Sequence, residues 1–318
     1  MKKYDKTIFC IIAGILLVSG CASRKADWKQ EPKYRLATYA AEIRYDIADK
    51  IRPVPDIVLQ SMNSADNTDV YKNHPAEPGQ VRLILEYFDL LPEPFREIWH
   101  DRLAGIYLVE NFLGGGMADL CFDDKGNMYM VLFLNPLIFS KSMEEWIDFR
   151  DNSPFFDDNS GTEIHSRVSG NFRELLHIMT HETAHMYDSY NHETPYMYPV
   201  MKSATPEKES YPFTDGVWAD YSIPVKEYDF PGRLDIASYG LGKQLPRSRA
   251  QELYRDLAET PFCSLYASRL WVEDFAEWFT WNYLKKTLGI SYSVTVSGDE
   301  GTFVFTPPED LSRSTLLN

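Results

Sequence analysis

The distribution of apolar residues divides the chain into stretches with different expected structures. Runs of apolar and β-branched residues occupy positions 106–109, 118–122 and 128–134, a pattern typical of buried β-strands. The last two runs are separated by Asp-Asp-Lys-Gly-Asn at 123–127, which is a turn signal. We therefore expect a β-hairpin over 118–134. Three glycines at 114–116 precede it and predict a flexible or bulged connection.

Two later segments have helical spacing. Residues 172–188 contain neither proline nor glycine, and their apolar residues recur at near-helical intervals. Ser169 or Asn171 is the expected N-cap of this helix. Residues 271–286 place aromatic residues on one helical face, namely Phe275, Trp278, Phe279 and Tyr283. Further helices are expected at 39–51, 81–90 and 247–257. The predicted fold class is therefore α+β.

Aromatic and proline residues are concentrated between the two helical segments, from 190 to 260. Long ordered segments beside a site often take part in function. This stretch is either a lid or groove over a site or a region of compact irregular packing, and the sequence favours neither interpretation.

The first 21 residues have the features of a targeting segment. Lysines at 2, 3 and 6 precede an apolar run at 8–18, which is shorter than the roughly 20 residues that span a bilayer. The sequence Val18-Ser19-Gly20-Cys21 resembles the lipobox of bacterial lipoproteins, which implies cleavage before Cys21 and lipidation of that residue. An ordinary signal peptide that contains a cysteine is the alternative.

The lipobox resemblance implies a protein of the bacterial cell envelope that is anchored to a membrane by its N-terminal lipid. Residues 22–33 would form the tether, and 34–318 a single domain with 190–260 as an insertion. Ala22 after the lipid-bearing cysteine favours the outer membrane if the host is Gram-negative.

Composition narrows the classes of partner. The 318-residue chain has a formal net charge of −15, which argues against binding to nucleic acid or to an anionic lipid surface. Apart from the N-terminal cysteines, only Cys121 and Cys263 remain. They either form a disulfide, which an oxidising compartment permits, or stay as two buried thiols.

The most specific chemical signal is the sequence His181-Glu182-Thr183-Ala184-His185. Two histidines four residues apart project from one face of a helix, close enough for both imidazoles to bind one Zn²⁺, and the glutamate after the first can act on a water as general base. His177 lies on the same face, but three histidines at this spacing span about 12 Å and cannot all reach one ion. His177 is therefore expected to support the site or to lie in the core.

A catalytic zinc needs a third protein ligand and keeps one position open. Glu273 and Glu277 lie four residues apart in the second helical segment, so one can bind the ion while the other orients a ligand imidazole. Glu273 is the predicted ligand. Asp274 points about 100° away from that face and is the weaker candidate.

Together the two segments resemble the gluzincin metallopeptidases, and within them the catalytic domain of anthrax lethal factor and its relatives. Residues 181–190 resemble that family's HExxHxxDxY motif, and residues 266–277 resemble its Y-x6-E-x-F-A-E motif. The resemblance implies that zinc is bound by His181, His185 and Glu273. It implies further roles for Glu182 as the base, for Tyr266 as a donor to the oxyanion, for Glu277 in orienting a ligand, and for Asp188 at the helix end or behind the ligands.

The family's fold would be zincin-like, with a small β-sheet packed on the HExxH helix and a mainly helical remainder. In that arrangement an edge strand holds the substrate extended, and 128–134 is the expected strand. The function implied is a zinc-dependent peptidase, an endopeptidase, displayed as a lipoprotein and acting on protein or peptide substrates. The alternative is a binding or assembly lipoprotein with a structural or vestigial metal site.

Overall fold

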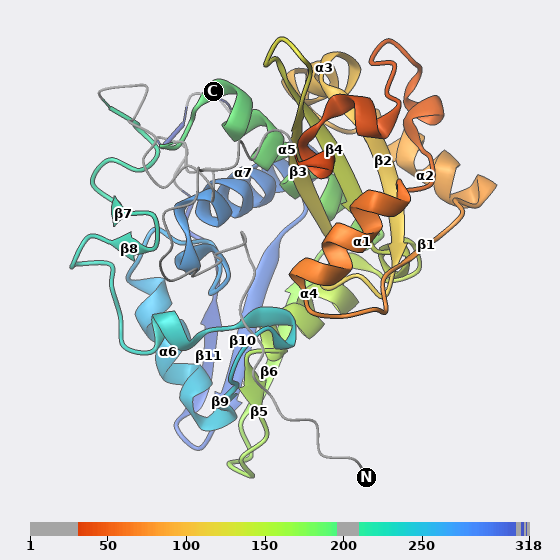
Figure 1. Ribbon diagram of the computed structural model, residues 1–318. Helices are drawn as coiled ribbons and strands as arrows, with labels where there is room; N and C mark the ends of the chain where they lie inside the picture. The colour runs from red at the N-terminus through yellow and green to blue at the C-terminus, as the bar shows by residue number, and fades with distance from the viewer. Residues whose placement is uncertain (1–30, 196–209, 310–312, 315, 317–318) are drawn as a thin grey trace, which may run out of the picture.

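A four-stranded mixed sheet forms one half of the molecule (Figure 1). The computed structural model describes residues 31–195, 210–309, 313–314 and 316. The strand order is β1-β2-β4-β3, with bounds Lys72–Asn73, Leu103–Glu110, Met128–Leu134 and Gly116–Phe122. The central strands β2 and β4 run parallel, and β3 pairs antiparallel with β4. The sheet therefore has β3 at one edge, and the predicted hairpin over 118–134 is confirmed.

Both faces of this sheet are covered, because its strands carry apolar residues in both directions. In β4, Met130, Leu132 and Leu134 join the larger core cluster, whereas Val131 and Phe133 join a second one. The first face packs towards α2 (Pro78–Phe88), α3 (Glu93–Asp101) and α5 (Glu174–Asn191), and the second towards α1 (Asp56–Ala65). Strands that are buried on both faces have continuous runs of apolar residues in their sequence. Such runs made β2, β3 and β4 predictable from the sequence.

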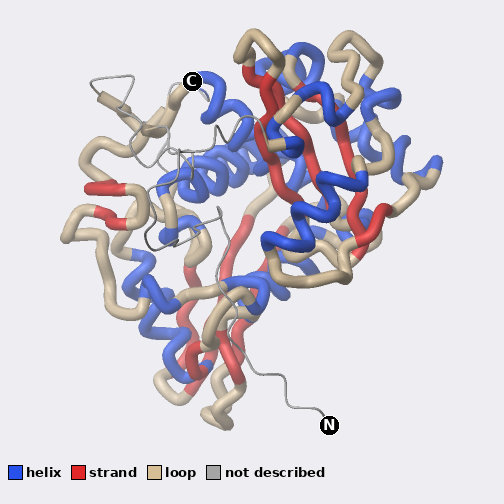
Figure 2. Tube along the Cα trace, viewed as in Figure 1, coloured by secondary structure: helices blue, strands red, loops and turns tan. Residues whose placement is uncertain are grey.

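A second sheet, of three strands, forms the other half (Figures 1 and 2). It has the order β11-β10-β6, with bounds Gly301–Phe305, Tyr292–Gly298 and Glu163–Val168. Helix α4 (Met143–Asn152) packs on β6, and α6 (Ala250–Ala258) on β10 and β11. Two short strand pairs, β5 with β9 and β7 with β8, complete the strands, with bounds Phe155–Phe156, Leu245–Pro246, Trp218–Asp220 and Ile223–Pro224.

Helices α5 and α7 (Trp271–Leu288) pack against each other, and α5 also packs on β3. From α7, Trp281 stacks on Tyr292 of β10 with ring centroids 4.5 Å apart. The two helices therefore join the two sheets. Both helices were predicted from their spacing, and their existence is confirmed.

Other expectations need correction. Residues 39–51 do not form a helix but two short 3₁₀ turns, Leu36–Tyr39 and Ile47–Lys50, separated by Ala40 in the left-handed region with φ 44°. The buried ammonium of Lys50 donates to the carbonyl oxygens of Trp99 and His100, so long-range contacts override the local pattern there.

The N-cap prediction was also wrong. Arg173 occupies the N-cap position of α5 without a side-chain cap, while Ser169 donates its backbone N–H to Ser291 and extends the pairing of β6 with β10. The predicted α+β class is confirmed, and the part of the molecule outside the first sheet contains, besides helices, a second sheet that the sequence did not predict. Among the other helices, α2 and α6 confirm the segments at 81–90 and 247–257 with shifted ends. Helices α3 and α4 were missed, and α1 was not predicted as a segment of its own.

Cys121 and Cys263 are both buried and unpaired, so the two-thiol alternative is the one observed. Burial raises the pKa of both thiols. Among the described residues no helix is long and apolar enough to cross a membrane. Residues 1–21 and most of the expected tether lie outside the described residues, as do 196–209 of the 190–260 segment.

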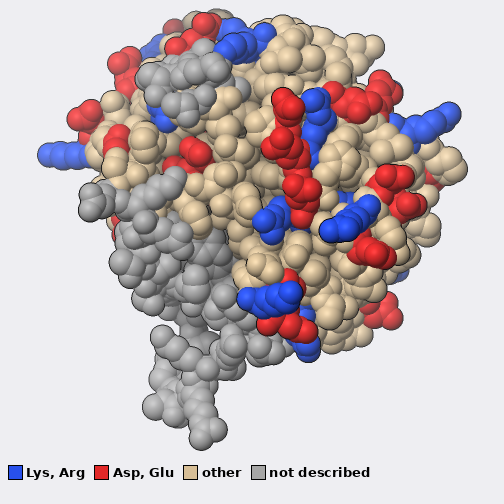
Figure 3. Space-filling view, turned by 90° about the horizontal axis from the view of Figure 1, so that it is seen from above, with Lys and Arg blue, Asp and Glu red and all other residues tan. Residues whose placement is uncertain are grey.

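The surface carries charges of both signs close together. On the face drawn in Figure 3, acidic and basic side chains are interspersed over the surface. Exposed ion pairs also occur on the surface of the described structure, such as Arg167 with Glu144 at 3.1 Å and Lys141 with Glu145 at 3.6 Å. Exposed pairs of this kind contribute little to stability.

Candidate metal centre

Helix α5 carries the His-Glu-x-x-His sequence in its buried middle. The helix ends at His192, which has a left-handed φ of 56° and donates its N–H to the Asp188 carbonyl at 2.7 Å. Thr183, inside the motif, is fully buried and accepts a hydrogen bond from the indole N–H of Trp99 at 2.8 Å. This contact fixes the rotation of α5 against α3, and so determines which face of α5 turns towards α7.

Three side chains meet where α5 faces α7. The Nε2 atoms of His181 and His185 are 3.2 Å apart, and Glu273 Oε2 lies 3.3 Å from the first and 3.4 Å from the second. Three atoms bound to one ion at tetrahedral angles and bond lengths of about 2.0–2.1 Å lie about 3.3 Å from one another. The observed triangle therefore has the size that a tetrahedral zinc site requires.

The surroundings of this triangle also fit a cation. Glu273 Oε2 is buried and has no hydrogen bond of good geometry among the described residues. Burial acts to raise the pKa of Glu273, but the facing imidazoles of His185 and His181 outweigh it and lower that pKa. Burial lowers the pKa of His181, but the carboxylates of Glu273 and Glu277 outweigh it and raise the pKa to about 10. His185 has the most exposed of the three side chains, at 19%, so the triangle approaches solvent on that side.

Glu182 points towards the edge strand β3. Its Oε2 atom accepts a hydrogen bond of 2.7 Å from the backbone N–H of Ala118. This contact holds the carboxylate beside the two histidines of the same helix. The strand next to the motif helix is therefore β3; β4, which the sequence suggested, lies inside the sheet between β2 and β3.

The glycines before the hairpin permit this close approach. A Cβ atom at Gly115 or Gly116 would lie 2.5 or 2.6 Å from side-chain atoms of Ile178 on α5. Only Gly114 has a left-handed φ, of 79°. Gly114 and Gly115 lie in the irregular connection before β3, and Gly115 and Gly116 in addition permit close helix–strand packing, a role that the sequence did not predict.

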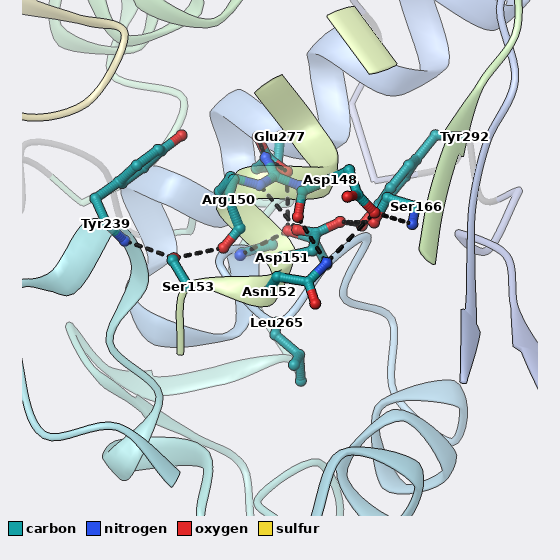
Figure 4. A network of polar contacts seen from close by, with 12 residues as sticks. Asp148, Arg150, Asp151, Asn152, Ser153, Ser166, Tyr239, Leu265, Glu277 and Tyr292 are labelled. Atoms are coloured by element: carbon teal, nitrogen blue, oxygen red, sulfur yellow. Dashed lines mark hydrogen bonds and ion pairs between the residues drawn. The ribbon is translucent and has the colours of Figure 1, made fainter. Parts of the chain in front are cut away.

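Glu277 lies behind the triangle, with its carboxylate fully buried. Its Oε1 atom is 3.3 Å from His181 Nδ1, the ring nitrogen on the side away from Glu273. This is an ion-pair distance, and Nδ1 makes no hydrogen bond of good geometry among the described residues. Arg150 Nη1 donates to both oxygens of Glu277 at 2.9 Å (Figure 4). Further hydrogen bonds to Glu277 come from Ser264 and Trp281. The expected role of Glu277 in orienting a ligand imidazole fits this placement.

His177 is within the same polar cluster but outside the triangle. Its Nδ1 lies 2.8 Å from Glu174 and its Nε2 lies 3.5 Å from Glu277. His177, His181 and Glu277 form a second group close enough to hold a cation. The guanidinium of Arg150 already neutralises Glu277, which argues against a cation in this second position. The contacts with Glu174 and Glu277 place His177 beside the site, which is one of the two positions expected for it.

Asp274 and Asp188 are both engaged away from the triangle. Asp274 pairs with Arg313 at 2.5 Å and accepts a hydrogen bond from the indole of Trp218 at 2.9 Å. Asp188 accepts hydrogen bonds from the backbone N–H and the hydroxyl of Thr194, each at 2.7 Å. Asp188 therefore holds the chain after the end of α5, which is the first of the two roles considered for it.

Tyr266 lies over the triangle. Its ring centroid is 6.1 Å from that of His181 and 6.2 Å from that of Tyr239. Burial raises the pKa of Tyr266 well above its usual value, so the phenol keeps its proton and can donate a hydrogen bond. Tyr239, in the 190–260 segment, has a left-handed φ of 59° and is held by a hydrogen bond from its N–H to Ser153.

Sequence reasoning missed Arg150, Ala118 and Thr183. Arg150 belongs to α4, far from both motif segments in sequence, and no pattern marks it. Ala118 acts through its backbone, which no side-chain motif reveals. Thr183 stands at an unrestricted position of the motif, and only its buried contact with Trp99 shows its role.

Comparison with protein-family models, with curated proteins and with solved structures gave no match for this chain. The function of this protein is therefore inferred from its residues and their geometry.

Proposed function

We propose that this protein is a zinc-dependent peptidase of the zincin type. The observation that carries the proposal is the triangle of His181, His185 and Glu273, with distances of 3.2 to 3.4 Å, beside the carboxylate of Glu182. A structural zinc site is usually closed by four protein ligands, whereas a catalytic site has three and keeps one position open. Among the described residues the triangle offers three ligand atoms, which favours a catalytic site.

The protein residues around the triangle have the roles that peptide hydrolysis needs. A Zn²⁺ ion held there would act as a Lewis acid on the scissile carbonyl and lower the pKa of a water. Glu182 takes the proton of the attacking water and delivers it to the leaving amine. Ala118 holds the Glu182 carboxylate in place through its N–H. Tyr266 donates to the oxyanion, and this interaction is strongest in the transition state.

The position of β3 supports a peptide substrate. Among the described residues β3 pairs with β4 on one side, and its other side has a single bridge, between Phe122 and Arg35. An extended peptide can add to such an edge through main-chain hydrogen bonds. The same edge lies next to α5, so a peptide paired with β3 would run past Glu182.

The proposed setting is the bacterial cell envelope, with the chain anchored through a lipid on Cys21. A lipid anchor there would confine the enzyme to extracytoplasmic substrates, either proteins or the peptide cross-links of the cell wall. Neither the anchor nor the substrate bears on the geometry of the triangle, so the two parts of the proposal stand independently.

The test combines metal content with turnover. Purified protein lacking the first 21 residues is dialysed against a weak chelator, its zinc is measured by elemental analysis, and its activity is measured on a peptide library. We expect about one zinc per chain, lost in His185→Ala. Glu182→Gln should retain zinc and lose turnover by about 100-fold or more.

Glu252→Gln is the matched control, since it makes the same change on the exposed face of α6. Activity of Glu182→Gln equal to that of this control would remove Glu182 as the base. A folded protein that takes up no zinc when zinc is offered would overturn the proposal as a whole.

A further inference from the structure

Arg150 is one of the largest fully buried side chains of the described structure, with 1% of its surface exposed. It reaches from α4 to α7, where its Nη1 atom donates to both oxygens of Glu277 at 2.9 Å. Its Nε atom donates to Asp151 Oδ1 at 3.0 Å. Figure 4 shows the guanidinium between the two carboxylates. No function considered so far requires a buried arginine at this position.

We infer that Arg150 is a positioning residue for the metal ligand His181, and that it acts through Glu277. The inference rests on the proposed metal site. The contacts form a continuous path in which Arg150 binds Glu277, Glu277 faces His181 Nδ1 at 3.3 Å, and His181 Nε2 faces the metal position. Arg150 itself touches none of the three ligands of the triangle in the contacts described.

The tautomer of His181 determines whether its Nε2 atom can bind a metal. A neutral histidine carries its single ring proton on one nitrogen, and only the other nitrogen can bind a metal. A carboxylate facing Nδ1 favours the tautomer with the proton on Nδ1, which leaves the Nε2 lone pair free. Glu277 is the only carboxylate that faces Nδ1 among the described residues. The tautomer of His181 therefore depends on where the Glu277 carboxylate is held.

The Glu277 carboxylate is held in place by hydrogen-bond donors from three residues. Four donor contacts reach its oxygens: two from Arg150, one from Ser264 and one from Trp281. Arg150 alone brings a full positive charge. A buried carboxylate without a partner charge is strongly disfavoured, and charge-assisted contacts to a guanidinium also define its orientation. Arg150 therefore both permits the buried carboxylate and determines how it is oriented.

The network around Arg150 also has an excess of negative charge. Between Asp151 and the triangle the network contains the carboxylates of Asp151, Glu277 and Glu273 and the single guanidinium of Arg150. With neutral imidazoles these four groups carry a formal charge of minus two, which favours a cation at the triangle. Asp151 is in turn held by the hydroxyls of Ser166 and Tyr292, at 2.7 and 2.6 Å. The second sheet thus supports the arginine that orients the ligand.

The test compares Arg150→Met and Arg150→Lys with Arg233→Met in the purified protein. Arg233 is the matched control, because it is equally buried but bonds to Ser268, Ser222 and Asp229 and has no contact with Glu277. Zinc affinity is measured by competition with a chelator on the folded fraction of each protein. We expect Arg150→Met to weaken zinc binding by about 10- to 100-fold, and Arg150→Lys to recover part of the loss.

A purely structural role for Arg150 would lower the melting temperature without changing the zinc affinity of the folded protein. Equal zinc affinities of Arg150→Met and wild type, or equal losses in Arg150→Met and Arg233→Met, would overturn the inference. If Arg150→Met does not fold, Arg150→Lys supplies the same comparison, because it retains the charge but not the paired donation to both oxygens.

A second readout needs no metal. Because the facing carboxylates raise the pKa of His181 to about 10 in the metal-free protein, the ¹⁵N spectrum is recorded above that pH, where the neutral imidazole carries a single proton and its position reports the tautomer. The His181 signals are assigned by comparison with His181→Gln. We expect the proton on Nδ1 in wild type and a mixture of tautomers in Arg150→Lys. A wild-type proton on Nε2 would overturn the inference about Arg150. Failure of the wild type to bind zinc with the proton still on Nδ1 would overturn the proposed function and leave only the effect of Arg150 on the His181 tautomer.

Discussion

The neighbouring residues Glu273 and Asp274 of α7 are expected to have different roles, Glu273 in metal binding and Asp274 in the stability of the fold. Both carboxylates are buried, with 5% and 0% of their surface exposed. Glu273 faces two imidazoles across the triangle, whereas Asp274 faces Arg313 and Trp218. Replacing each by its amide changes the same group at adjacent positions. We therefore expect opposite effects from the two substitutions.

The magnitudes follow from these contacts. Removing one partner of a buried ion pair costs about 3–5 kcal/mol, and Asp274 is paired with Arg313 at 2.5 Å with both side chains buried. Asp274→Asn should therefore lower the free energy of unfolding of the metal-free protein by about this amount. Zinc at 100 times its dissociation constant adds about 2.7 kcal/mol to the stability of a protein that binds it only when folded. Asp274→Asn should keep that increment.

Glu273→Gln should lose the increment. If the amide weakens zinc binding by about 100-fold, the same zinc concentration adds only about 0.4 kcal/mol. The assay is urea unfolding followed by tryptophan fluorescence, with EDTA and with buffered zinc, for wild type and both variants. A zinc increment lost in Asp274→Asn and kept in Glu273→Gln would show that the ligand assignment is wrong, and that Asp274 binds the ion in place of Glu273.

Two other predictions concern packing and pH. Gly116→Ala would place a Cβ atom 2.6 Å from Ile178 and 3.1 Å from the backbone oxygen of Phe133; such overpacking should cost about 1–3 kcal/mol in urea unfolding, and unchanged stability would refute the close approach of β3 to α5. Burial lowers the pKa of Lys50 to about 8, whereas an unfolded lysine titrates near about 10.4. Between these values the unfolded chain binds more protons, so the stability of wild type relative to Lys50→Met should rise from pH 7.5 to pH 10; a constant difference would contradict this.

The parts of the site that lie on one helix face could be predicted from the sequence. His181, Glu182 and His185 follow helical spacing, and Glu273 and Glu277 follow it again on α7. Local periodicity determines which side chains share a face. It does not determine which faces meet, so the 3.2 to 3.4 Å triangle between α5 and α7 needed the structure.

The remaining parts depend on contacts between segments distant in sequence. Arg150 lies 127 residues before Glu277, and nothing in the sequence around it distinguishes it from an exposed arginine. The predicted helix at 39–51 failed for a related reason, since Lys50 is buried against α3. Strands β6 and β10 alternate between buried and more exposed residues, but β6 lies more than 100 residues before β10 in the chain, and only their pairing makes them part of one sheet.

The ionisable side chains between α5 and α7 affect both the packing of the two helices and the proposed binding of a metal. Two buried helices usually pack through apolar side chains, yet here the contact includes three carboxylates and three histidines. Burying ionisable groups costs free energy unless they are paired. Arg150 compensates Glu277, and Glu174 faces His177 at 2.8 Å. Glu273 has only the two imidazoles of the triangle as partners. Because the carboxylates raise the pKa of His181 to about 10, a proton on His181 compensates Glu273 in the metal-free protein, at the position where a cation would bind. Zinc would therefore both complete the proposed active site and stabilise the packing of α5 on α7.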